Sequence, residues 1–296
     1  MVGMTQAPII EVTDLTVAYG SYSAVRGVSF AVGRGELYAL LGTNGAGKTT
    51  TLETVEGHRP PSGGQVRVFG KNPQDRKDVR PRTGIMLQES GFAPDLTVRE
   101  TVGLIGKLTH RDDDIDRVLD AADLTGKRDT KVAQLSGGEK RRLDFATAIF
   151  GSPDLVFLDE PTTGLDIQAR DALWDAVDRL REDGATIVLT THYLEEAQRR
   201  ADRIGLMHEG LIQLEGTVAE LTAALPSTIR FTRPDTAETL PLDTRAEETG
   251  AVLIETRHLQ RDLMVLLRWA EEHSVELPDL AAGSTSLDDV FRTLNR

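Results

Sequence analysis

The clearest chemical pattern in the chain is G-x-x-x-x-G-K-[ST], which follows a short apolar run. It comprises Gly42, Thr43, Asn44, Gly45, Ala46, Gly47, Lys48 and Thr49. Glycines at these positions let consecutive backbone N–H groups converge on phosphate oxygens, and a helix that follows adds its positive end. We expect Lys48 to reach the outer phosphates of a nucleotide and the Thr49 hydroxyl to bind Mg²⁺. A plain glycine-rich turn followed by an exposed lysine is the alternative.

This loop alone predicts the binding of a nucleoside triphosphate, which a kinase, a GTPase or a motor would all show. A GTPase is disfavoured because the chain contains no Asn-Lys-x-Asp motif that could read guanine.

A pair of carboxylates indicates that the bound nucleotide is hydrolysed. The apolar run 155–158 is followed by Asp159 and then directly by Glu160. In the sheet of a phosphate-loop protein, such an aspartate holds Mg²⁺ through water. The next carboxylate can act as general base on the attacking water. Two solvated acids at a strand end are the alternative.

A serine and two glycines precede that strand, in the run Leu135–Glu139. Ser136, Gly137 and Gly138 open a predicted helix, so backbone N–H groups and a hydroxyl form a second anion-binding N-terminus. The alternative is an ordinary helix N-cap by Ser136, with glycines that only permit the turn. The Ser-Gly-Gly run occurs in the same chain as the phosphate loop and the two carboxylates, and this combination favours the anion-binding interpretation.

Hydrophobic periodicity predicts the elements that position these residues. The first part of the chain is strand-rich, and its runs are residues 9–18, 24–32, 36–41 and 65–69, of which the third leads directly into Gly42. Residues 91–150 have helical character. There, Thr97 and Glu100 form a capping box, residues 112–124 form a second helix, and a third helix opens after Gly138.

A parallel-sheet pattern follows the helical region. Residues 154–159 and 186–191 read as buried strands, and the segment between them carries an apolar stripe and ends at Gly184. Strand, helix and strand in this order indicate a βαβ unit. After residue 225 the pattern changes. Strands are expected at 229–231 and 252–255 and helices at 259–270 and 287–294, so residues 226–296 are predicted to form a small accessory domain.

Composition excludes several classes of protein. The chain has 296 residues, with 34 Lys and Arg against 47 Asp and Glu, and its net charge of −13 argues against sequence-independent binding of nucleic acid. The absence of cysteine removes disulfides, thiol catalysis and cysteine-ligated zinc. No apolar window is long enough to span a bilayer, and residues 1–8 do not read as a signal peptide. These features predict a soluble, cytoplasmic chain.

Residues 8–222 carry these motifs in an order that resembles the ATP-binding cassette (ABC) ATPases. The loop at 42–49 is then the Walker A motif, which Thr50 extends, Leu155–Asp159 is Walker B, and Leu135–Gly138 is the signature. The resemblance implies an α/β P-loop fold with a mixed central sheet, an antiparallel β subdomain and a helical subdomain at about 91–150. It places this cassette at residues 1–225, followed by a small α+β domain. ATP and Mg²⁺ are the implied cofactors.

Four single residues match further positions of the family. The resemblance implies that Tyr19 stacks on adenine, that Gln88 touches Mg²⁺ and senses a membrane partner, that Asp166 belongs to the D-loop, and that His192 contacts the γ-phosphate. Each has an ordinary alternative, namely a half-exposed strand aromatic, a polar strand end, a helix N-cap and a hydrogen-bonded structural histidine. Glu139 stands where glutamine is commoner, and it is therefore not counted as a nucleotide contact.

The resemblance also implies an assembly. In the family the signature of one chain meets the ATP held by a second, so two cassettes sandwich two nucleotides. Here the second cassette is expected to be another copy of this chain, with a closely related chain as the alternative. Residues 135–144 and 286–291 look like those of the drug-resistance exporter ATPases typified by daunorubicin efflux. This predicts a bacterial exporter ATPase on the inner face of the membrane, with a separate multi-spanning permease whose coupling helix docks near Gln88–Leu96. The cargo would be a drug, an antibiotic or a lipid-like molecule.

Two other functions stay open at this point. A soluble ABC protein of translation, DNA repair or chromosome organisation is disfavoured, because the chain has one cassette, no cysteine zinc module and no long coiled-coil insertion. The ATPase subunit of an importer is disfavoured because the regulatory domains of importers are typically longer than residues 226–296.

Overall fold

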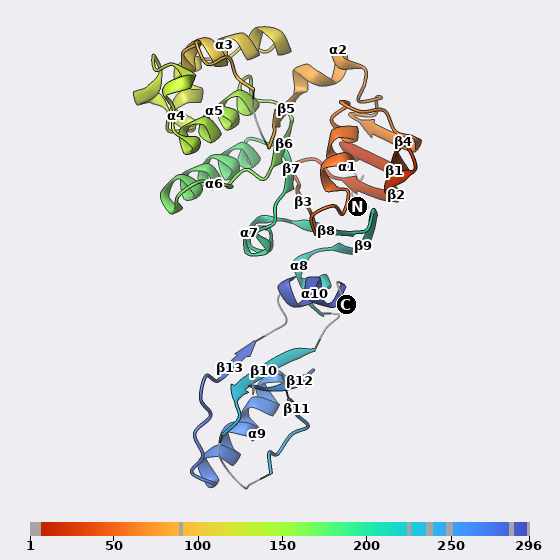
Figure 1. Cartoon of the computed structure of the whole chain (residues 1–296), viewed down its shortest axis with the longest axis vertical. Coiled ribbons are helices and arrows are strands. Elements are labelled where there is room, and N and C mark those ends of the chain that lie inside the picture. Colours follow the sequence, from red (N-terminus) through yellow and green to blue (C-terminus); the bar gives the residue numbers. More distant parts are fainter. Residues whose placement is uncertain are drawn as a thin grey trace, which may run out of the picture. The chain divides into compact units, whose positions relative to one another are not determined.

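The computed structural model describes residues 7–88, 91–223, 226–234, 239–246, 251–283 and 287–294. The chain divides into two compact units, Met1–Glu215 and Gly216–Arg296, which are described separately (Figure 1). This division lies before the boundary predicted after residue 225, because helix α8 (Val218–Ala223) contacts α10 (Leu287–Leu294) within the second unit. Among the described residues, no helix combines the length and the apolar character needed to cross a bilayer.

The first unit is built on a six-stranded sheet with the order β5-β6-β7-β3-β8-β9. Its strands are β5 (Thr83–Met86), β6 (Leu155–Asp159), β7 (Thr186–Thr190), β3 (Leu37–Gly42), β8 (Arg203–His208) and β9 (Leu211–Gly216). The pairs from β5 to β8 are parallel. Only Glu209 and Gly210 join β8 to β9, and so short a connection requires antiparallel strands. The predicted mixed sheet is confirmed.

The central strands are buried because both faces of the sheet are covered. Every residue of β3, β6 and β7 is buried, which is why these strands read as continuous apolar runs in the sequence. The second sheet of this unit has the order β2-β1-β4 and is antiparallel throughout. It comprises β1 (Ile10–Tyr19), β2 (Tyr22–Val32) and β4 (Gly63–Val68). Its apolar faces share one core with helix α1 (Lys48–Val55), through Leu52 and Val55.

Helices α3 (Val98–Thr109), α4 (Ile115–Ala121) and α5 (Gly137–Ile149) pack against one another and lie together in Figure 1. The predicted capping box is present, since the Thr97 backbone N–H donates to Glu100 Oε2 (2.8 Å) and the Glu100 N–H donates to Thr97 Oγ1 (3.2 Å). Helix α4 is shorter than the predicted 112–124, because Asp114 caps it by accepting from the Asp116 N–H (2.9 Å). The remaining helices of this unit are α2 (Arg76–Val79), α6 (Ile167–Glu182) and α7 (Leu194–Arg200).

The second unit is a small α+β domain. Strands β10 (Ser227–Thr232), β11 (Arg245–Ala246), β12 (Ala251–Thr256) and β13 (Ala281–Gly283) form an antiparallel sheet with the order β11-β12-β10-β13. Helix α9 (Leu259–Glu272) covers one face of this sheet. Its Leu266 and Trp269 pack on Ile229, Phe231 and Ile254. Ser286, the first residue of the exporter-like C-terminal motif, lies outside the described residues.

A buried acid at the end of α1 gives a prediction about stability. Burial raises the pKa of Glu56, and the adjacent His58, 3.1 Å from Glu56 Oε2, only partly opposes this. Within the described residues, Glu56 Oε1 has no hydrogen-bond partner. A carboxyl whose pKa is raised on folding contributes most to stability below its unfolded pKa of about 4.3, and this contribution is lost as the pH rises through the folded value.

We therefore expect Glu56→Gln to raise the free energy of unfolding at pH 8, and this gain to vanish towards pH 4. Urea denaturation of the wild type and the variant at both pH values measures the difference. The exposed Glu182 offers a control, since Glu182→Gln should change stability little at either pH. A gain for Glu56→Gln that is the same at both pH values would contradict the ionisation argument.

Candidate nucleotide site

The loop predicted to bind phosphate lies between the end of β3 at Gly42 and the start of α1 at Lys48. At two positions of the loop only glycine fits, because a backbone carbonyl of another segment occupies the place of a Cβ atom. A Cβ on Gly42 would lie 2.2 Å from the Met207 carbonyl oxygen, and one on Gly47 would lie 2.4 Å from that of Ala24. Gly47 also has φ of +98°, which L side chains rarely adopt. The strand–loop–helix context expected from the sequence is present.

We expect Gly47→Ala to destabilise the protein by at least about 1 kcal/mol, because the new Cβ meets the Ala24 carbonyl and the left-handed backbone is strained. The shift of the thermal midpoint measures the loss. Gly126→Ala is the matched control, since a Cβ there meets nothing within 4 Å and the backbone is not left-handed. Equal midpoints for the two variants would contradict this account.

Lys48 is folded back onto the loop that it follows. Its Nζ donates to the carbonyl oxygens of Gly42 (2.8 Å) and Thr43 (3.1 Å). Burial lowers the pKa of the Lys48 ammonium, and the carboxylates of Glu160 and Asp159 act in the opposite direction. The amine is thus held at the edge of the loop by two neutral acceptors, which phosphate oxygens could replace with stronger, charge-assisted bonds.

A cavity of about 290 Å³ lies over the loop and brings together residues that are far apart in the sequence. Its walls come from the β1–β2 hairpin, the loop with the start of α1, the segment after β5, and the end of β6. The residues are Tyr19, Tyr22, Ala24, Asn44, Gly45, Gly47, Lys48, Thr49, Thr50, Gln88, Asp159 and Glu160. The aromatic, the loop, the glutamine and both predicted carboxylates therefore face one space.

The two carboxylates differ in their surroundings. Asp159 is buried at the end of β6, where burial raises its pKa and a hydrogen bond donated by Thr190 Oγ1 opposes the rise. Glu160 adopts a left-handed conformation, with φ of +51°, so the chain leaves the alternation of the strand at this residue. Its Oε2 lies within hydrogen-bonding distance of His192 Nδ1, and Thr163 Oγ1 donates to it at 3.4 Å. One carboxylate is thus fixed at a strand end and the other at the tip of a turn.

The residues fit a magnesium ion that binds together with a nucleotide. Among the described residues, no three His, Cys, Asp or Glu side chains gather into a metal site of their own. Mg²⁺ at nucleotide sites uses one or two carboxylates, with phosphates and waters as the other ligands. Asp159, the Thr49 hydroxyl and the Gln88 amide supply oxygen donors in one cavity.

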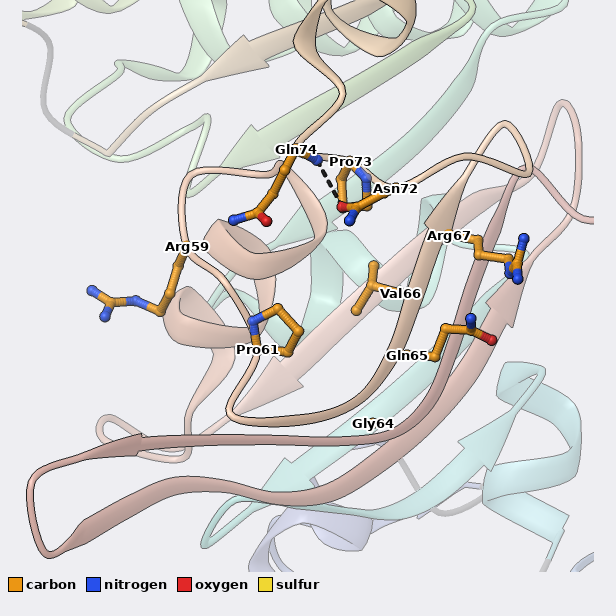
Figure 2. Close-up of a pocket in the computed structure, with 9 residues that line it drawn as sticks. All are labelled: Arg59, Pro61, Gly64, Gln65, Val66, Arg67, Asn72, Pro73 and Gln74. Atoms are coloured by element: carbon orange, nitrogen blue, oxygen red, sulfur yellow. Dashed lines mark hydrogen bonds between the residues drawn. The ribbon is translucent and has the colours of Figure 1, made fainter.

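Tyr19 stands at the mouth of this cavity, and 43% of its surface is exposed. Its hydroxyl lies 3.3 Å from Thr50 Oγ1, and the Arg59 guanidinium lies 4.4 Å from its ring centroid. A second hollow of about 310 Å³ adjoins Arg59 (Figure 2). There, Arg59 and Arg67 extend in opposite directions, so this hollow has no converging cations and is a weak candidate for an anion site.

Known proteins similar to this chain carry the same combination of elements. Residues 25–163 match the ABC transporter family, and residues 227–286 match the ABC transporter domain-containing protein-like C-terminal domain. The Nod factor export ATP-binding protein I of Paraburkholderia xenovorans is 39% identical over 256 residues, which cover 82% of this chain and 84% of that protein. The daunorubicin/doxorubicin resistance ATP-binding protein DrrA of Streptomyces peucetius is 34% identical over 306 residues, which cover 96% and 92%. The chain belongs to the ABC transporter ATPase family.

A solved structure agrees with this assignment. The dimeric structure of a bacterial ABC transporter cassette matches with a TM-score of 0.65 and 27% identity, over 70% of this chain and 98% of that one. The resemblance and the cassette fold expected from the sequence are both confirmed. The match to a C-terminal domain family also shows that the second unit recurs in other ABC proteins.

The signature and the D-loop of this ABC ATPase lie outside the Walker A cavity. Ser136 caps α5, since its Oγ accepts from the Glu139 N–H (3.2 Å) and Glu139 Oε2 accepts from the Ser136 N–H (2.8 Å). Asp166 caps α6 by accepting from the Ala169 N–H (2.8 Å). A Cβ on Gly138 would lie 3.7 Å from Leu165, so signature and D-loop are neighbours. Both capping roles are those given above as the ordinary alternatives.

The remaining residues predicted to contact the nucleotide do not line the cavity. Gly42, Thr43 and Ala46 are not among the residues that line the cavity, and the first two present carbonyl oxygens to Lys48 instead. Ala46 is buried in the core beside β1 and β2. His192 is not among the lining residues either; its Nδ1 contacts Glu160, and its ring lies 4.0 Å from that of Tyr193.

Two residues next to the site were not predicted. Thr190 ends β7 directly opposite Asp159 in the β6–β7 register, and a polar β-branched residue at that strand end is the one sequence feature that could have suggested its role. Arg141 lies in α5 and is buried, and its side chain donates to the backbone carbonyls of Gln88 and Glu160. A sequence pattern does not record contacts to backbone carbonyls, so nothing in the sequence singled it out.

Proposed function

We propose that this chain is the ATP-binding and ATP-hydrolysing subunit of a bacterial ABC exporter that works with a separate membrane permease. The observation that supports ATP hydrolysis is the shared cavity, in which Lys48, Gln88, Asp159 and Glu160 face the Walker A loop. Export is supported by the relatives that match most of the chain, which are named for Nod factor export and for daunorubicin resistance. A drug, an antibiotic or a lipid-like molecule is the corresponding class of cargo.

In this proposal the chain's residues take separate parts in hydrolysis. Lys48 exchanges its two carbonyl acceptors for phosphate oxygens, and Tyr19 stacks on the adenine. Thr49, Gln88 and Asp159 hold Mg²⁺, which when bound neutralises charge on the phosphates. Glu160 takes the proton of the attacking water, and His192 holds the Glu160 carboxylate in place beside the γ-phosphate.

A second copy of the chain completes each site in this proposal. Ser136, Gly137, Gly138 and Asp166 do not line their own Walker A cavity. The N–H groups of Gly137 and Gly138 and the Ser136 hydroxyl are therefore available to the phosphates of a nucleotide held by a partner, with Asp166 at the same interface. The dimeric structure of the related cassette supports such an arrangement. No nucleic-acid partner is proposed, in keeping with the net charge of −13.

The permease would dock in a hollow of about 320 Å³ beside Gln88. Four apolar side chains line it, those of Ile85, Leu87, Phe92 and Ile105, and polar residues such as Thr83 and Arg80 complete its walls. An amphipathic helix places its apolar face in such a groove. Docking there would put the permease next to the Gln88 segment and hold this chain at the inner face of the membrane.

Capture of the partner tests this function. Tagged Glu160→Gln protein, incubated with Mg-ATP and solubilised native membranes, should retain a multi-spanning membrane protein in stoichiometric amount, which mass spectrometry identifies. Ribosomal or DNA-repair proteins without a membrane partner would overturn the exporter role and leave a soluble ABC ATPase. A membrane partner that travels with a substrate-binding protein would indicate an importer instead.

A further inference from the structure

Arg141 is a charged residue in an unusual position. It lies in α5, five residues after Ser136, and only 7% of it is exposed. Arginine is almost never buried to this extent unless its charge and its N–H groups are paired. Its ion pair with Asp144 is long, at 3.9 Å, so the close partners of the guanidinium lie elsewhere.

All five N–H groups of the Arg141 guanidinium face backbone carbonyl oxygens. Nη1 donates to Leu87 (2.5 Å) and Gln88 (3.1 Å), Nη2 donates to Asp159 and to Glu160 (2.7 Å), and Nε donates to Pro161 (3.3 Å). Five donors in one rigid plane are the full capacity of arginine. Lysine has only three donors, on a flexible stem, and cannot reproduce this pattern.

These carbonyls belong to two segments that the sheet does not hold together. Strands β5 and β6 pair in parallel up to Met86 and Leu158, where the hydrogen-bonded ladder between them ends. Beyond this point residues 87–88 leave the sheet, while Asp159 still pairs with Thr190 of β7 and residues 160–161 then turn away. Gln88, Asp159 and Glu160 line the nucleotide cavity here. Arg141 bridges them beyond the end of the ladder, with hydrogen bonds to both.

The bridge also holds a strained residue. Glu160 has φ of +51°, and such conformations cost about 1–3 kcal/mol and persist only when the surroundings fix them. Arg141 donates to the carbonyls of Asp159, Glu160 and Pro161, which are the peptide units around this turn. With these carbonyls fixed, the direction in which the Glu160 side chain leaves the backbone is fixed as well.

We propose that Arg141 is a positioning residue for ATP hydrolysis, because it locks the backbone of Gln88 to that of the Asp159–Pro161 turn. The metal ligands Gln88 and Asp159 and the base Glu160 then keep one mutual geometry. Arg141 itself touches neither nucleotide nor metal. This role rests on the proposed function. It adds a physical link between α5, whose first turn is the signature, and the hydrolytic groups of the same chain.

Steady-state ATPase assays of Arg141→Gln and Arg141→Lys in the full chain test this role. For Arg141→Gln we expect kcat to fall about 100-fold, as misplacement of reacting groups by about 1 Å does. The Mg²⁺ concentration for half-maximal activity should rise. Binding of a fluorescent ATP analogue without Mg²⁺ should stay within about threefold of wild type, since the Walker A loop is untouched. Arg141→Lys should have an intermediate kcat.

Arg111 provides the matched control. It is partly buried and donates to two backbone carbonyls of α5, those of Ala148 (2.9 Å) and Thr147 (3.1 Å). Among the described residues, it makes no hydrogen bond to residues 87–88 or 159–161. Arg111→Gln should lower the thermal midpoint about as much as Arg141→Gln does, while its kcat per nucleotide-binding molecule stays within about threefold of wild type. This comparison separates positioning from general stability.

Three results would overturn the role of Arg141. The first is a kcat of Arg141→Gln close to that of an active wild type. The second is an equal loss of kcat in Arg111→Gln. The third is loss of nucleotide binding in both Arg141 variants, which would mean that Arg141 is needed for folding. A wild-type chain with no ATPase activity would overturn the proposed function, and this role with it. Activity of the wild type therefore distinguishes the two failures.

Discussion

Glu160→Gln is expected to bind Mg-ATP as tightly as the wild type and to hydrolyse it about 1,000-fold more slowly, within the range that a general base contributes. The amide keeps the size and the left-handed position of the side chain but cannot accept the proton of water. The Walker A loop and the Asp159 carboxylate are unchanged, so affinity should persist. Phosphate release under single-turnover conditions measures the rate, and gel filtration with Mg-ATP should show a stable dimer.

Glu209→Gln is the control for this substitution. Glu209 also has a left-handed backbone, with φ of +45°, but it lies in the β8–β9 turn, is exposed, and pairs only with Arg26 in the described structure. Its variant should hydrolyse ATP at the wild-type rate. If Glu160→Gln kept more than about a tenth of the wild-type rate, another group would be the base. In that case His192, whose Nδ1 contacts Glu160, is the next candidate, and His192→Ala should abolish the remaining activity.

Lys48→Met is expected to weaken ATP binding by about 100-fold, because hydrogen bonds from a charged donor contribute about 1.5–3 kcal/mol. The methionine side chain has a similar length and apolar stem, so the core beneath the loop should remain packed. The loss should be in affinity for ATP and not in the fold. Equilibrium titration with a fluorescent ATP analogue measures it, and circular dichroism checks the structure.

The hydrogen bonds of Lys48 in the nucleotide-free protein are a second reason to expect weaker ATP binding in Lys48→Met. Lys48 already donates to Gly42 and Thr43, so methionine also removes two hydrogen bonds that hold the loop before the nucleotide arrives. Lys107→Met, on the exposed face of α3, is the matched control and should bind ATP normally. Affinity in Lys48→Met within a few-fold of wild type would mean that the backbone N–H groups alone hold the phosphates.

The sequence predicted those parts of the site whose residue types are dictated locally. The glycines of the Walker A loop are required by backbone approach and positive φ, and the apolar strands around it are required by burial. The cap at Ser136 and the capping box at Thr97 follow equally from local chemistry. Strands β8 and β9 were not predicted. β8 is short and buried, and a short apolar run does not by itself distinguish a strand from a helix. β9 is exposed over three of its six residues and carries little periodicity.

The unpredicted parts depend on register and on distant backbone atoms. Thr190 acquires its role only because β6 and β7 pair with Asp159 opposite Thr190. The partners of Arg141 come from positions 18–54 residues away and are all carbonyl oxygens, which every residue type supplies. Such features require coordinates.

The cap of α5 has one more consequence. Ser136 uses a lone pair of its hydroxyl to accept from the Glu139 N–H, and the hydroxyl proton is not needed for that bond. The serine can therefore donate to the nucleotide of a second chain while it still caps its own helix. In the proposed dimer, the two subunits would then close on ATP and separate after hydrolysis as rigid bodies. The first turn of α5 would not unwind and re-form in each cycle. None of the free energy of ATP binding and hydrolysis would then be consumed in refolding this interface, so all of it would be available for motion of the proposed membrane partner.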